Sequence, residues 1–96
     1  MVEGNTVRIV AINKKFAIDL EAIPGAGYMW EFVQHPEEIE LVDQKLISIS
    51  KAIGGTSTQR FILVARQPGN YILVFELKRR WEKTSVKTSE FEIQAR

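Results

Sequence analysis

Apolar and polar residues alternate with a period of two through most of this chain, and this pattern constrains the fold more than any other feature. The alternation is clear in the stretches 16–22, 28–33, 71–78 and 90–95. In each stretch, the large apolar side chains fall on one face, as in a half-buried β-strand. A chain of 96 residues has enough apolar surface for one core but not for two. We therefore predict a single all-β domain over residues 1–96.

Two other apolar runs, residues 7–12 and 59–65, alternate less cleanly, and we interpret them as strands covered on both faces. The stretch 36–50 allows two interpretations. Pro36 followed by two glutamates resembles the start of a helix, and apolar residues recur near helical spacing. The same stretch also reads as two short strands that meet near Asp43. We favour the strands, because elements of one small domain tend to share layers.

Segments rich in glycine and proline separate the apolar runs, as expected of turns. The segment Gln67–Asn70 predicts a tight hairpin, because Pro68 fixes its own φ and Gly69 can adopt a positive φ. Short strands separated by turns favour an immunoglobulin-like antiparallel β-sandwich. The loops at one end of such a sandwich can act together as a binding surface.

Composition excludes several kinds of site. Thirteen Lys and Arg face twelve Asp and Glu, and the net charge of +1 argues against nucleic acid or an anionic membrane as a partner. The absence of cysteine excludes disulfides and a thiol nucleophile, and one histidine is too few for the usual zinc sites. We expect no enzyme activity, cofactor or metal. No signal peptide is visible, which leaves the cytoplasm and export after signal removal both open.

Three segments are candidate binding elements, although each also has a purely structural interpretation. Ile23–Gly27 is either a flexible connection or a narrow prong whose bare backbone could enter a cleft. Lys51–Thr56 contains two adjacent glycines, which by themselves indicate only a turn. Lys78–Lys83 is a basic strand end that leads into a loop.

Single aromatic residues add to this picture. Trp81 lies where the alternation ends and charges gather, so we expect it to be exposed and able to anchor an interface. Trp30 lies within a clean alternating strand, so we expect it in the core. We place His35, before a proline, in a solvated loop. No nucleophile-elbow motif accompanies it.

Taken in order, the three segments resemble the signature of the chagasin-like inhibitors of cysteine peptidases. That signature reads Asn-Pro-Thr-Thr-Gly-Tyr/Phe-x-Trp, then Gly-x-Gly-Gly, then Arg-Pro-Trp/Phe. The chain matches it at Pro24, Gly27, Tyr28, Trp30, Gly54, Gly55, Arg79 and Trp81. It departs where Ile23 replaces the asparagine, Gly25 and Ala26 the two threonines, Ala52 a glycine and Arg80 the proline. The resemblance covers nearly the whole chain.

The resemblance implies an immunoglobulin-like β-sandwich that inhibits papain-like cysteine peptidases reversibly and without a covalent bond. Three loops at one end would occlude the active-site cleft, the first by entering it and the other two by lying along its sides. The residues implied to bind the peptidase are Pro24, Gly25, Ala26, Gly27, Tyr28, Ile53, Gly54, Gly55, Thr56, Arg79, Arg80 and Trp81. The peptidase would be the only partner, and we expect a monomer.

The departures from the signature leave a second interpretation open. An immunoglobulin-like structural or adhesion module could keep the same frame without inhibiting any peptidase, and could bind a partner at a sheet edge. The changed positions lie in the loops, where they affect potency and target preference. We expect weaker binding than with the full motif, because each threonine hydrogen bond that is lost is worth about 0.5–1.5 kcal/mol.

Overall fold

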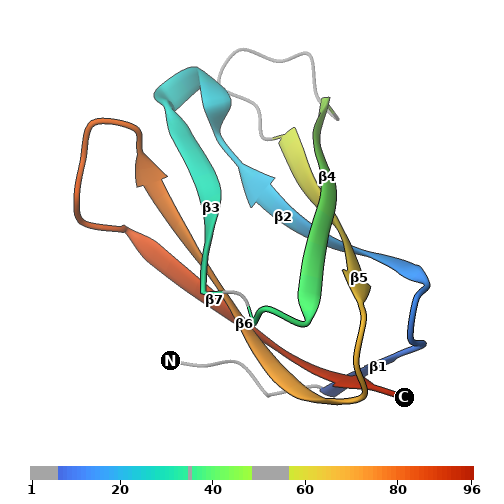
Figure 1. Ribbon diagram of the computed structural model, residues 1–96. Helices are drawn as coiled ribbons and strands as arrows, with labels where there is room; N and C mark the ends of the chain where they lie inside the picture. The colour runs from blue at the N-terminus through green and yellow to red at the C-terminus, as the bar shows by residue number, and fades with distance from the viewer. Residues whose placement is uncertain (1–6, 35, 49–56) are drawn as a thin grey trace.

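The computed structural model describes residues 7–34, 36–48 and 57–96. Within these residues, seven strands and one 3₁₀ turn form a sandwich of two sheets (Figure 1). The elements are β1 (Val7–Val10), β2 (Lys15–Ala22), η1 (Pro24–Ala26), β3 (Tyr28–Gln34), β4 (Ile39–Ser48), β5 (Ser57–Ala65), β6 (Gly69–Arg79) and β7 (Lys87–Ala95). One sheet has the order β1-β7-β6-β3 and the other β2-β5-β4. β1 and β7 pair in parallel and the other strands pair antiparallel, which confirms the predicted all-β sandwich.

The inward faces of the strands are those that the alternation predicts. The largest fully buried side chains come from both sheets and are Ile18, Ile39, Phe61, Leu63, Leu73, Phe75 and Ile93. Phe75 stacks on Phe32 with ring centroids 4.5 Å apart and meets Phe61 from the other sheet at 4.8 Å. Such aromatic pairs add about 0.5–1.5 kcal/mol each beyond the area they bury. The core therefore lies between the sheets and is centred on phenylalanine rings.

In the stretch with two interpretations, Ile39–Ser48 form a strand, so the helix alternative is wrong for the described residues. They also form one strand and not the two that we expected. β4 pairs with β5 along its length, and the register shifts between Leu41 and Asp43. The extra residue, Val42, forms a β-bulge at the place where the two short strands were predicted to meet. A bulge changes which residues face inward, so the alternation in the sequence breaks there.

The expectation that residues 7–12 and 59–65 are covered on both faces is wrong. β1 is an edge strand, and its Val7 and Ile9 are 45% and 55% exposed, because none of the described residues form a third layer over the outer face of its sheet. β5 is the central strand of its sheet, but only its inner face is buried along most of its length. Arg60 and Ile62 on the outer face are half-buried.

The predicted hairpin at Gln67–Asn70 is also wrong, because this segment joins β5 to β6, which belong to different sheets. Gly69 has a φ of +154°, so the turn does use the freedom of glycine. The Tyr71 hydroxyl donates a hydrogen bond to the Gln67 carbonyl at 2.8 Å and fixes the crossing. A tyrosine bonded to the backbone a few residues upstream is the tyrosine corner of immunoglobulin-like sandwiches. The residue types of this segment predicted a turn, but they could not predict that the strand after it belongs to the other sheet.

Candidate functional site

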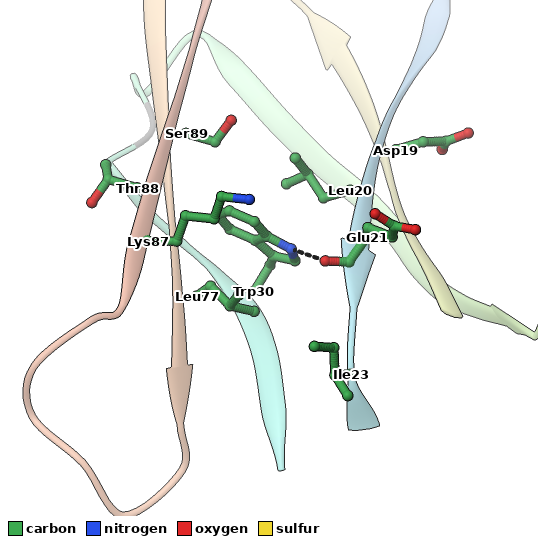
Figure 2. Close-up of a pocket in the computed structure, with 9 residues that line it drawn as sticks. All are labelled: Asp19, Leu20, Glu21, Ile23, Trp30, Leu77, Lys87, Thr88 and Ser89. Carbon is green, nitrogen blue, oxygen red and sulfur yellow. Dashed lines mark hydrogen bonds between the residues drawn. The ribbon is translucent and has the colours of Figure 1, made fainter. Parts of the chain in front are cut away.

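The first candidate loop, residues 23–27, is fastened at its base by Trp30. This residue is 7% exposed, as predicted for the core. Its indole N–H donates a hydrogen bond to the Glu21 carbonyl at 2.7 Å (Figure 2). The bond ties β3 to β2 next to the loop that joins them. A pocket of about 300 Å³ lies beside the Trp30 ring. Figure 2 shows the Lys87 side chain, from β7, extending toward this ring.

A buried glutamine, Gln59 of β5, fastens Trp30 from the other sheet. The Gln59 side-chain oxygen accepts a hydrogen bond from the Trp30 backbone N–H, and its amide nitrogen donates one to the Trp30 carbonyl, both at 2.8 Å. The side chain thus takes the place of a neighbouring strand on the open edge of β3. Gln59 was not among the predicted site residues. The only signal in the sequence was a polar residue at the start of the apolar run 59–65, and its burial is seen only in the structure.

The loop itself is one closed turn of 3₁₀ helix. Ile23 and Tyr28 exchange two backbone hydrogen bonds, with N–O distances of 3.1 and 3.0 Å. Inside this closure, the Ala26 N–H donates to the Ile23 carbonyl at 3.1 Å, and the Gly27 N–H donates to the Pro24 carbonyl at 2.9 Å. The backbone is therefore defined by four hydrogen bonds, in contrast to the flexible connection that composition alone allows.

The two glycines of this loop have different roles. Gly27 has a φ of +85°, a left-handed conformation that side chains disfavour, and a Cβ added to it would lie 3.2 Å from the Trp81 ring. A Cβ added to Gly25 would meet nothing within 4 Å, and its φ is not positive. The structure therefore requires glycine at position 27 but not at position 25.

Arg79 joins the first candidate loop to the third. Its Nε–H donates to the Ala26 carbonyl at 3.3 Å, and its guanidinium carbon lies 4.5 Å from the centre of the Tyr28 ring and 5.9 Å from that of Trp81. The Glu82 carboxylate lies 3.8 Å from the same Nε. One side chain thus contacts both loops, so the arginine of the third motif positions the backbone of the first.

The third candidate loop connects β6 to β7 and carries an exposed tryptophan. Trp81 is 72% exposed, which confirms the prediction. Beside it runs a groove of about 580 Å³ lined by Gly27, Met29, Trp30, Glu31, Lys78, Arg80 and Trp81. On its rim, the Lys78 ammonium contacts the Glu31 carboxylate at 2.9 Å. Their hydrogen bond is the main cause that raises the pKa of Lys78.

The structure brings together two of the three predicted segments at one end of the sandwich (Figure 1). The predicted residues that meet there are Pro24, Gly25, Ala26, Gly27, Tyr28, Arg79, Arg80 and Trp81. The other predicted site residues, Ile53, Gly54, Gly55 and Thr56, lie outside the described residues, as does His35. The strand ends that flank them are described. Ser57 pairs with both Ser48 and Ala22. Ala22 is the last residue before the first loop.

The described residues contain no group of His, Asp and Glu side chains that could hold a metal ion. No helix in the part of the chain that the structure describes is long and apolar enough to cross a membrane.

Solved structures of other proteins share this fold, and among them are the following three. The cysteine protease inhibitor EhICP2 from Entamoeba histolytica is 18% identical, with a TM-score of 0.81 over 96% of this chain and 87% of that one. Amebosin is 18% identical, with a TM-score of 0.75 over 96% of this chain and 90% of its own. PbICP-C, solved in complex with falcipain-2, is 19% identical, with a TM-score of 0.74 over 100% of this chain and 95% of its own.

No curated protein sequence matches the chain closely enough to count as a relative. The family model described as chagasin family peptidase inhibitor I42 matches residues 9–95, which is nearly the full length. This match agrees with the three motifs and with the sandwich that carries them. The chain therefore belongs to the chagasin family of peptidase inhibitors and is not an enzyme.

Proposed function

We propose that this chain inhibits papain-like cysteine peptidases reversibly and without a covalent bond, by occluding the active-site cleft with the loops at one end of the sandwich. The observation that carries the proposal is the junction at Arg79, which holds a closed backbone turn beside an exposed tryptophan. Membership of a peptidase-inhibitor family supports it, as does PbICP-C, a structural neighbour solved in complex with falcipain-2.

In this proposal the first loop enters the cleft with its main chain leading. Gly25 and Ala26 are exposed at its tip and carry almost no side-chain bulk, so the loop is narrow. The carbonyls of Ile23 and Pro24 already accept hydrogen bonds inside the turn. The loop therefore cannot be drawn into an extended, substrate-like strand without losing those bonds, and it would resist cleavage.

The other two loops lie along the two sides of the cleft in this proposal. Trp81, exposed on the third loop, packs on one wall as an aromatic anchor. Residues 52–56 line the other wall, mainly through their backbone. The first and third loops are held by contacts within the chain, so they lose little entropy on docking, which favours affinity. An interface of about 800 Å² on each partner is typical of inhibitor complexes.

Titration of a panel of papain-like peptidases tests the proposal. We expect inhibition at or below micromolar concentrations, competitive with substrate and reversed by dilution. If no enzyme of the panel is inhibited, the proposal is wrong, and the alternative of a structural or adhesion module takes its place. That alternative places the partner at a sheet edge, so it does not explain why a tryptophan is exposed beside a closed turn.

Replacing Trp81 with alanine should raise the inhibition constant about fivefold or more, because an aromatic anchor at an interface is worth more than about 1 kcal/mol. The free energy of unfolding should stay within about 0.5 kcal/mol, since the ring is largely exposed. The matched control is Val86→Ala, which removes another exposed apolar side chain from the same hairpin loop. Equal inhibition constants for the two variants would show that Trp81 is not an anchor.

A further inference from the structure

The positive charge of the chain is concentrated in the third loop and in the ends of β6 and β7 that flank it. Residues 78–87 hold five Lys or Arg and one Glu, a formal charge of +4. Since the whole chain carries +1, the other residues together carry −3. A nearly neutral chain thus has a concentrated run of positive charge around the loop that also exposes Trp81.

Among the described residues, Lys78 and Arg79 have acidic partners, whereas Arg80 and Lys83 have none. Lys78 pairs with Glu31 at 2.9 Å, and the loop's only acidic residue, Glu82, lies 3.8 Å from Arg79. Arg80 and Lys83 are exposed and form no ion pair within the described residues. Their charges are therefore available to a partner.

The groove beside Trp81 combines the charge of Arg80 with apolar surface. Met29 and the Trp81 ring contribute apolar lining, and Arg80 also lines the groove. A partner surface that fits both features carries carboxylates next to an apolar contact. A phosphate backbone fits less well, because Glu31 also lines the groove.

We propose that the third loop directs this inhibitor to peptidases whose cleft wall on that side is acidic. The inference rests on the proposed function and names the chemistry of the partner. Carboxylates on the wall face Arg80 and Lys83 while Trp81 packs beside them. Because both cations are at the surface, they act mainly by speeding association, and salt screens their effect.

Papain and papain with succinylated lysines provide a matched pair of probes, because succinylation turns cationic sites into carboxylates. Activity on a small peptide substrate checks that the active site is intact. We expect the chain to associate with the succinylated form at least about threefold faster at low salt. The difference should disappear near 0.5 M salt, where the screening length is only about 4–5 Å.

The double variant Arg80→Gln/Lys83→Gln should lose this preference, and Arg80→Lys/Lys83→Arg, which keeps the charge, should retain it. Lys14→Gln/Lys15→Gln removes the same amount of charge at the other end of the sandwich, where Lys15 pairs with Val64. This control variant should keep the preference for succinylated papain. Equal rates for both forms of papain, or a loss of preference in the Lys14/Lys15 variant, would overturn the inference.

The outcomes separate the inference from the proposed function. If papain is inhibited but its charge has no influence, only the inference fails. If neither form is inhibited and no other peptidase of the panel is, both fail. A single-stranded oligonucleotide is added as a competitor and should leave the rates unchanged. Displacement of papain by it at near-stoichiometric concentration would mean that the loop recognises phosphate and not an acidic wall.

Discussion

Replacing Gln59 with methionine should lower the free energy of unfolding by about 2–4 kcal/mol, measured by urea denaturation. Methionine keeps the volume of the side chain but cannot hydrogen-bond to Trp30. The Trp30 N–H and carbonyl would then lose the two 2.8 Å bonds that Gln59 supplies. Each buried polar group left without a partner costs about 1–3 kcal/mol, a large share of the stability of a domain of this size.

Gln44→Met is the control for this prediction. Gln44 lies on β4, on the face turned toward the other sheet, but its side chain is exposed. The same substitution there should change the free energy of unfolding by no more than about 0.5 kcal/mol. If both variants unfold at the same urea concentration, the Gln59 bonds contribute nothing measurable, and the account of how the first loop is fastened is wrong.

Replacing Gly27 with alanine should weaken inhibition by about tenfold to a hundredfold. The left-handed φ of +85° costs a residue with a Cβ about 1–2 kcal/mol. The new methyl would also lie 3.2 Å from the Trp81 ring, so the ring must move away from the first loop. The substitution therefore disturbs two contact elements at once. The inhibition constant for papain measures the loss.

Gly25→Ala is the matched control, and the quantity compared is the free energy of unfolding of the two variants. A methyl group at position 25 meets open space, and the backbone there does not need a positive φ. Alanine should therefore raise the free energy of unfolding by about 0.4–1 kcal/mol, because it restricts the unfolded chain. Gly27→Ala should lower it by about 1–2 kcal/mol. A shift of the same sign and size at both positions would contradict the assignment of the left-handed turn.

Much of the fold could be predicted because a period of two reports directly which face of a strand is buried. It does not report which strands are neighbours. The segment Gln67–Asn70 has the residues of a tight turn, yet it connects two sheets, and the bond from Tyr71 that fixes the crossing leaves no periodic signal. Likewise, the bulge at Val42 disrupts the alternation and made one strand look like two.

For the candidate site, the motifs predicted which segments matter but not how they are held together. Arg79 and Ala26 are 53 positions apart in the chain, and only the folded sandwich brings the guanidinium to the carbonyl. Gln59 stands outside every motif. Its role depends on the open edge of β3, which is a property of the strand order. Contacts of this kind depend on topology, so residue spacing alone could not show them.

The first loop owes its shape to groups behind its tip. Three groups hold the loop in place: the Trp30 indole, the Arg79 guanidinium, and the backbone hydrogen bonds between Ile23 and Tyr28. The outermost side chains contribute nothing to that support, so they can vary at little cost to stability. A lineage could therefore exchange hydroxyls for hydrogens or methyls at the tip, as this chain does relative to the family motif, and adapt to new enzymes while its scaffold stays unchanged.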